Sequence, residues 1–238
     1  MLQVQGLSKK YGAIVVADGI DFALDPGQCL GVIGPNGAGK SSLFNLITGV
    51  ARADAGSVRL GGVELLGQPP HRRARLGVAR AFQIPQAFGN LTVYENVLAA
   101  ASFGAGLSGA QAARRAVDAL SRCGLQARSR DMAGRLPLLD RKRLEMAKAI
   151  ATDPRLLLLD EVAGGLTEPE VAALATLVAE LKTQVAVIWI EHIPQALHAV
   201  ADRILVLHFG RKLLEAPPDE AMASREVREI YMGLAAEA

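Results

Sequence analysis

The chain contains the stretch Gly34-Pro35-Asn36-Gly37-Ala38-Gly39-Lys40-Ser41, which matches the pattern G-x-x-x-x-G-K-[ST] at every fixed position. The apolar run 29–33 precedes it and predicts a buried strand of a parallel sheet. The segment 42–48 follows it and predicts a helix that ends at Gly49, a residue suited to a left-handed C-terminal position. The match therefore lies in the strand–loop–helix context that this pattern requires.

The residue types of this phosphate-binding loop (residues 34–41) suit a polyphosphate ligand. Glycines let backbone N–H groups approach phosphate oxygens, and the start of a helix adds further N–H groups and the positive end of a dipole. Lys40 supplies a mobile charge for the terminal phosphates, and Ser41 a hydroxyl for Mg²⁺. A glycine turn with a surface lysine is the alternative interpretation. We assign to a nucleoside triphosphate site Gly34, Pro35, Asn36, Gly37, Ala38, Gly39, Lys40, Ser41 and Ser42.

Length and composition limit the protein class. The 238 residues suffice for one large α/β domain or for a core with a subdomain, and the net charge of +2 indicates no nucleic-acid partner. The longest uncharged apolar runs, such as 185–190, are too short to cross a bilayer, and we expect no signal peptide. Cys29 and Cys123 form no metal-ligand pattern, so we expect reduced, unreactive thiols in the cytosol.

The order of predicted elements indicates an α/β core interrupted by helices. Predicted strands at 2–7, 13–24, 57–60 and 77–82 are followed by alanine-rich helices at 93–101, 109–121 and 141–151. The core resumes with a strand at 156–159, a helix that carries Val171 and Leu181, strands at 185–190 and 204–207, and short helices over 219–233. We therefore predict a first core segment at 1–83, a helical subdomain at 84–151 and a second core segment at 152–238.

A second nucleotide signal follows the apolar run 156–159, which delivers Asp160 and Glu161 to the carboxyl end of a strand. Ligands of open α/β sheets bind at that edge. An Asp there can hold the Mg²⁺ that bridges the β- and γ-phosphates, and an adjacent Glu can orient or deprotonate an attacking water. A solvated pair of turn carboxylates is the structural alternative.

In this order of motifs the chain resembles the ATP-binding-cassette family over essentially its whole length. The matching positions are Tyr11, the Walker A loop at 34–41, Gln83, the Walker B segment ending in Asp160 and Glu161, and His192. The resemblance implies a mixed sheet with an antiparallel β subdomain and an inserted α-helical subdomain.

The resemblance also implies roles for single residues. Tyr11 would stack on adenine, Gln83 would sense Mg²⁺ and a transmembrane partner, and His192 would contact the γ-phosphate. Gln83, Glu161 and His192 would form the catalytic group, with Mg²⁺ held by Ser41, Gln83 and Asp160. Each also has a structural alternative: a half-buried tyrosine, a glutamine that caps a strand and a histidine at a strand end.

Four further segments resemble, less specifically, the ATPase subunits of branched-chain amino-acid importers: residues 77–83, 91–97, 143–149 and 227–233. They imply a cytoplasmic ATPase, peripheral on the inner face of the membrane, that works with permease subunits, a second ATPase subunit and an extracytoplasmic solute-binding protein. The ATPase of a lipid or lipopolysaccharide exporter and a soluble cassette protein without a permease are the alternatives.

The family's signature, Leu-Ser-Gly-Gly-Gln, is altered here to Leu136-Pro137-Leu138-Leu139-Asp140. In the family, this segment of one subunit closes over the ATP of the other, with the serine hydroxyl and N–H groups at a helix start meeting the γ-phosphate. Proline offers neither hydroxyl nor N–H, and Asp140 brings negative charge towards the polyphosphate, although it also makes a good N-cap.

We therefore favour a heterodimer with unequal ATP sites, while closure through backbone contacts alone remains the alternative. Two smaller departures follow Walker B: Val162 replaces a proline, and Thr167 replaces the family's Asp or Asn. Thr167 with Glu170 predicts a capping box for the next helix.

Overall fold

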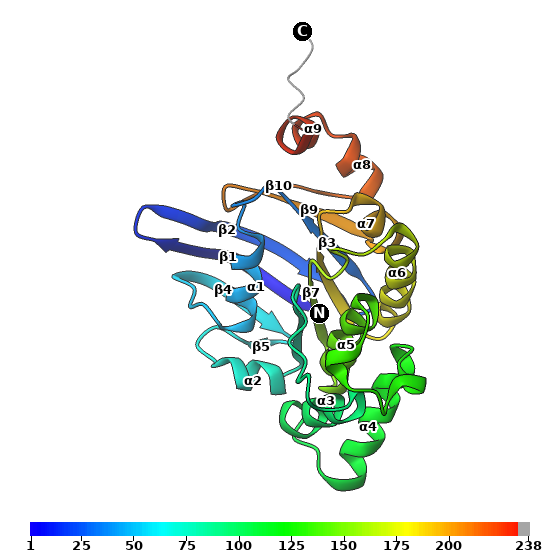
Figure 1. The fold of residues 1–238 in the computed structure, drawn as a ribbon. Helices are drawn as coiled ribbons and strands as arrows, with labels where there is room; N and C mark the ends of the chain where they lie inside the picture. Colours follow the sequence, from blue (N-terminus) through cyan, green and yellow to red (C-terminus); the bar gives the residue numbers. More distant parts are fainter. Residues whose placement is uncertain (233–238) are drawn as a thin grey trace.

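A six-stranded sheet forms the centre of the protein, as seen in a computed structural model that describes residues 1–232 (Figure 1). Its strand order is β10-β9-β3-β8-β7-β6, with β10 antiparallel to β9 and the other neighbours parallel. The strands are β3 (Cys29–Ile33), β6 (Val78–Ala81), β7 (Leu156–Asp160), β8 (Ala186–Ile190), β9 (Arg203–His208) and β10 (Arg211–Ala216).

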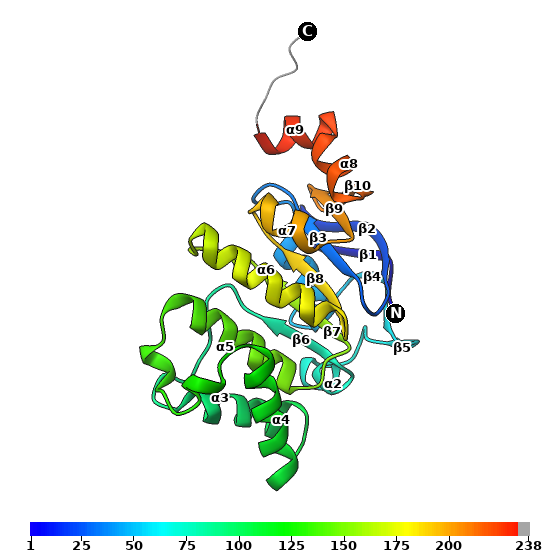
Figure 2. The same ribbon diagram turned by 90° about the vertical axis from the view of Figure 1, so that its right-hand side faces the viewer.

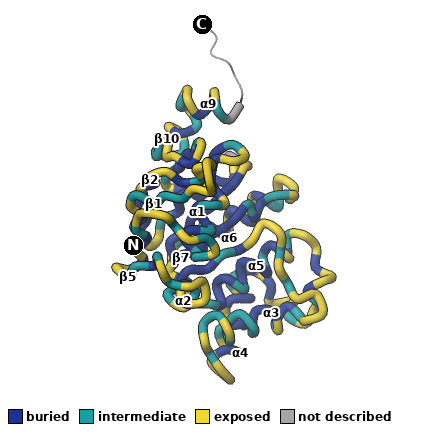
Figure 3. The backbone as a smooth tube through the Cα atoms, turned by 90° about the vertical axis from the view of Figure 1, so that its left-hand side faces the viewer, coloured by how far each residue is buried: buried dark blue, intermediate teal, exposed yellow. Residues whose placement is uncertain are grey.

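The central strands are continuous apolar runs because both faces of the sheet are covered. Every residue of β3, β7 and β8 is buried, and these strands run through the dark blue interior in Figure 3. The predicted strand at 29–33 is confirmed, and the one at 156–159 extends by one residue to include Asp160.

One face of this sheet packs on helix α1 and on a second, antiparallel sheet of order β2-β1-β4-β5. A single apolar cluster joins α1 to both sheets. The elements of this layer are β1 (Leu2–Tyr11), β2 (Ile14–Leu24), α1 (Lys40–Thr48), β4 (Ala55–Leu60), β5 (Val63–Glu64) and α2 (Pro70–Arg75).

The opposite face carries helices, and the same separation of layers is seen from the side in Figure 2. Helix α5 (Leu138–Ala151) packs there together with α3 (Val93–Ala99), a π-helical turn (Ala100–Gly104) and α4 (Gly109–Arg122). Helices α6 (Glu168–Lys182) and α7 (Pro194–Val200) cover the strands further along. Helices α8 (Pro218–Ala223) and α9 (Arg225–Met232) lie at the other end of the molecule from α3 and α4 (Figures 1 and 2).

These elements confirm the predicted α/β class with an antiparallel sheet, whereas some boundaries were wrong or missed. The polar segment 67–75 contains α2, and neither α7 nor β10 was predicted. Helix α5 begins at Leu138, three positions before the predicted start at Arg141. Gly233, the last residue of the predicted tail, lies outside the described residues.

In the part of the chain that the structure describes, no helix combines the length and the apolar character needed to span a membrane.

Candidate functional site

The phosphate-binding loop connects the buried end of β3 to the first residue of α1 and requires glycine at two positions. A Cβ on Gly34 would lie 2.3 Å from the Leu207 carbonyl oxygen, and one on Gly39 would lie 2.4 Å from the Val16 carbonyl oxygen. Gly39 and Gly37 also have φ values of +104° and +82°, a region that side chains disfavour. The loop therefore folds back against the neighbouring backbone and leaves the helix start free for an anion.

The side chain of Lys40 crosses the loop rather than pointing to solvent. It is buried, and its Nζ donates to the carbonyl oxygens of Gly34 and Pro35 at 2.7 Å and 3.1 Å. Burial lowers the pKa of Lys40, and the nearby carboxylates of Glu161 and Asp160 oppose that shift. The ammonium is thus already positioned at the loop where terminal phosphates are expected.

Glu161 follows β7 directly and receives two of the predicted catalytic side chains. Its Oε2 accepts a hydrogen bond from Gln83 Nε2 at 2.6 Å, and its Oε1 lies 2.8 Å from His192 Nε2. Glu161 has a φ of 47°, and its backbone N–H donates to the Ile190 carbonyl at 2.9 Å. Three residues separated widely in the sequence therefore meet at one carboxylate, at the carboxyl edge of the sheet.

Asp160 lies in the last position of β7 and is buried. Its Oδ2 forms an ion pair with Arg80 on the neighbouring strand β6. Together with the exposed hydroxyl-bearing Ser41 and the amide oxygen of Gln83, its carboxylate gives an all-oxygen donor set. Because Mg²⁺ prefers oxygen ligands, these residues fit the predicted metal.

Arg80 is a site residue that the sequence reasoning missed, because only the register of β6 on β7 places it beside Asp160. In the parallel register Arg80 pairs with Leu158, two positions before Asp160. Side chains alternate between the faces of a strand, so Arg80 and Asp160 point to the same face, where α1 lies.

Tyr11 is the last residue of β1, at the turn into β2, and is 54% exposed. The Lys9 ammonium lies 4.8 Å from the centre of its ring. The ring is accessible to a ligand, and its adenine-stacking role stays a prediction.

Comparison with known proteins decides the family. The family model described as "ABC transporter" matches residues 17–164. Over 98% of both chains, the protein is 35% identical to the high-affinity branched-chain amino acid transport ATP-binding protein BraF of Pseudomonas aeruginosa. It is 33% identical to LivG of Escherichia coli K12, again over 98% of both chains. The chain belongs to the ABC transporter family.

Solved structures show the same fold. A nucleotide-free ATP-binding cassette of an ABC transporter superimposes with a TM-score of 0.88 at 26% identity, covering 98% of this chain and 99% of the other. The ADP conformation of the cassette MJ1267 gives 0.89 at 26% identity with the same coverage. This protein is therefore an ABC-type ATPase, and nucleotide is its ligand.

The altered signature segment of this ABC protein forms the start of α5. Pro137 is the N-cap and makes no side-chain capping bond. Arg141 Nε donates to the Leu136 carbonyl at 2.9 Å, which occupies part of that turn. The first turn thus offers a nucleotide neither a hydroxyl nor a glycine.

One expectation for Asp140 was wrong. It lies inside the first turn of α5 and is not the N-cap. Its side chain is 11% exposed and pairs with Arg128 Nε at 2.8 Å and with Arg143 NH1 at 3.5 Å. Two arginines therefore pair with the carboxylate that we expected to face a polyphosphate, and that expectation stays a prediction.

Helix α5 also holds the loop that carries Gln83, through side chains that the sequence analysis did not single out. Lys142 Nζ donates to the Gln83 carbonyl, and Glu145 Oε1 accepts from the Gln86 N–H at 2.7 Å. Lys148 Nζ donates to the Gln86 carbonyl at 2.6 Å. Burial lowers the pKa of Lys142, opposed first by Glu191.

The capping box at the start of α6 is confirmed, since Glu170 Oε2 accepts from the N–H and the hydroxyl of Thr167 at 2.9 Å and 2.8 Å. Thr167 is thus engaged within its own helix. Burial raises the pKa of the Cys29 and Cys123 thiols to about 12, which agrees with the expectation of unreactive cysteines.

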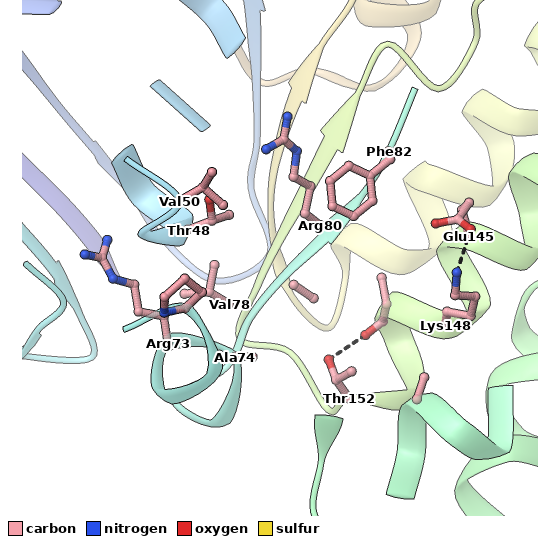
Figure 4. Close-up of a pocket in the computed structure, with 14 residues that line it drawn as sticks. Thr48, Val50, Arg73, Ala74, Val78, Arg80, Phe82, Glu145, Lys148 and Thr152 are labelled. Carbon is pink, nitrogen blue, oxygen red and sulfur yellow. Dashed lines mark hydrogen bonds and ion pairs between the residues drawn. The ribbon is translucent and has the colours of Figure 1, made fainter. Parts of the chain in front are cut away.

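A groove of about 330 Å³ lies beside the site, between α2, β6 and α5 (Figure 4). Arg80 and Phe82 form its inner wall, and Lys148 and Thr152 lie on the α5 side. Three large apolar residues on or next to the Gln83 loop are exposed: Phe82, Ile84 and Phe88.

Proposed function

We propose that this chain is the ATP-binding and ATP-hydrolysing subunit of an importer for branched-chain or related hydrophobic amino acids. Its similarity to BraF and LivG over 98% of each chain supports this assignment. The subunit would be peripheral on the cytoplasmic face of the membrane. Permease subunits would bind it directly, and a solute-binding protein outside the membrane would act through the permease.

The observation that carries the hydrolytic role is the Glu161 carboxylate held by Gln83 and His192 at 2.6 Å and 2.8 Å. A carboxylate so placed can orient a water for attack on the γ-phosphate, while His192 contacts the same phosphate. Ser41, Asp160 and Gln83 would hold Mg²⁺, which neutralises charge on the β- and γ-phosphates. Tyr11 would stack on the adenine.

We further propose that the phosphate-binding loop works with the signature of a different subunit. The first turn of α5 lacks the serine hydroxyl and the close backbone approach that closing a γ-phosphate requires. A homodimer would carry this defect in both sites, which favours a heterodimer. In this proposal the helical subdomain at 84–151 moves relative to the core segments at 1–83 and 152–238 when the two subunits close around ATP.

The groove beside Gln83 is the surface that we assign to the permease. Phe82 borders the groove. The apolar side chains of Ile84 and Phe88, on the same loop, are 71% and 60% exposed. Exposed apolar side chains grouped in this way indicate an interaction surface. The loop also carries Gln83, so a partner bound there reaches the catalytic group through one segment.

The test is copurification of the tagged chain from membranes of its own cells, followed by identification of its partners. We expect a hydrophobic permease and a second cassette ATPase. The variant Ile84→Asp should no longer copurify with the permease but should still bind ATP, since the Ile84 side chain is exposed. Recovery of the wild-type chain without any membrane protein would contradict the importer assignment. Uptake of labelled leucine into vesicles would then separate import from export.

A further inference from the structure

The strongest unassigned feature is the position of Arg80 beside the predicted metal ligand. Its guanidinium forms an ion pair with Asp160 Oδ2, and its NH1 donates to Asn45 Oδ1 on α1 at 2.9 Å. The two paired side chains are only 12% and 10% exposed. A charge pair this far from water interacts more strongly than a surface pair.

Two aromatic rings lie close to the guanidinium. Its central carbon lies 5.5 Å from the centre of the Phe44 ring and 4.9 Å from that of Phe82. Within residues 1–232, the buried Nε of Arg80 has no hydrogen-bond partner. The arginine is therefore fixed by packing and by two side-chain acceptors, and one of these acceptors is Asp160.

We propose that Arg80 is the counter-ion of Asp160 in the nucleotide-free protein and competes with Mg²⁺ for that carboxylate. The inference rests on the proposed function in one respect, the role of Asp160 as a metal ligand. A guanidinium and Mg²⁺ both need the carboxylate oxygens, and two cations close together in a poorly hydrated site repel each other. Binding of Mg²⁺ with ATP therefore displaces Arg80 from Asp160.

Arg80 also links the competition for Asp160 to the groove, because its side chain lines that groove. Arg80 and Phe82 both line it, so an occupant that presses on Phe82 changes the packing of the guanidinium (Figure 4). A bound partner would in this way alter the strength of the Arg80–Asp160 pair and hence the affinity for Mg²⁺. Arg80 acts here as a positioning residue for the metal ligand.

Calorimetric titration of a non-hydrolysable ATP analogue, in Mg²⁺ and in excess EDTA, tests the competition. The quantity of interest is the ratio of the two affinities. Arg80→Met should raise this ratio at least about tenfold, the lower end of coupling between close charge pairs. A ratio within about twofold of the wild type, or a lower one, overturns the proposal, because at 1.4 kcal/mol per tenfold step so small a change means negligible coupling.

Arg73→Met is the matched control. Arg73 is buried and lines the same groove, but its Nη1 donates to the backbone carbonyls of Leu46 and Ile47. Its loss should destabilise the protein and leave the affinity ratio unchanged. A rise of the same size in this control would assign the effect to general loosening of the groove and overturn the proposal.

Arg80→Lys replaces the methionine variant if the latter fails to fold. Lysine keeps the charge but lacks the planar fork that reaches Asn45 and Asp160 together, so its ratio should lie between those of the wild type and a neutral variant. A ratio equal to that of the wild type would show that the fork is irrelevant and contradict the proposal. Absence of nucleotide binding by the wild type in both conditions would instead overturn the proposed function.

Discussion

The geometry of the phosphate-binding loop predicts that Gly39→Ala destabilises the protein before any nucleotide is bound. Gly39 has a φ of +104°, and a Cβ there would lie 2.4 Å from the Val16 carbonyl oxygen. A non-glycine residue in such a conformation costs about 1–3 kcal/mol. Relief of the overlap requires a backbone shift, which adds about 1–3 kcal/mol. We expect a total loss of about 3 kcal/mol or more in the free energy of unfolding.

Gly37→Ala separates the two contributions. Gly37 also has a positive φ, +82°, but it is exposed and a Cβ there meets no atom within 4 Å. This variant should lose only the conformational part, about 1–2 kcal/mol. The difference between the two variants therefore measures the close approach of residues 16 and 39.

Urea unfolding of the nucleotide-free variants is the assay, because ligand binding then plays no part. For a chain of this length each kcal/mol lowers Tm by about 2–4 °C, so thermal unfolding provides a second measurement. Equal destabilisation by the two substitutions would refute the reasoning, since it would mean that the loop is not packed against Val16.

Glu161→Gln should bind ATP and hydrolyse it at least about 100-fold more slowly, because the general base is lost; near-normal single-turnover hydrolysis would remove Glu161 from its role. Thr167→Ala should cost about 1 kcal/mol in urea unfolding, through loss of the capping contacts with Glu170, without changing ATP affinity. Because burial raises the pKa of Cys29 and Cys123 to about 12, only about one thiol in 10⁴ is ionised at pH 8, and iodoacetamide should leave both unmodified in the folded protein; rapid labelling detected by mass spectrometry would contradict that pKa.

The elements that the sequence predicted well are those with strong local signals. The apolar run of β3, the glycines of the loop and Gly49 at the end of α1 each specify their conformation locally, and Gly49 indeed has a φ of +83°. The elements that were missed lack such signals. Helix α2 is polar and begins at Pro70, with Pro69 as its N-cap. Strand β10 is mostly exposed or half-buried, so its pairing with β9 defines it.

The site residues also fall into those that the sequence predicted and those that it did not. Motif order grouped Gln83, Glu161 and His192, and the structure places Gln83 and His192 within hydrogen-bond distance of Glu161. The pairing of Asp140 with Arg128 could not be foreseen, because no local pattern links a residue of the segment before α5 to one in its first turn. Predicting Arg80 as a site residue requires the register of β6 on β7, which no local sequence pattern supplies.

We propose that this chain's ATP site is intact but the signature it offers to a partner is not. Steady-state ATPase activity of the purified subunit, compared with that of a Pro137→Ser, Leu139→Gly double variant, tests it most directly. Since one donor to a transition state is worth about 100-fold or more, restoring the serine should raise self-paired turnover at least about tenfold. Adding Glu161→Gln to the double variant should abolish the gain. Wild-type activity equal to that of the restored variant would contradict the claim.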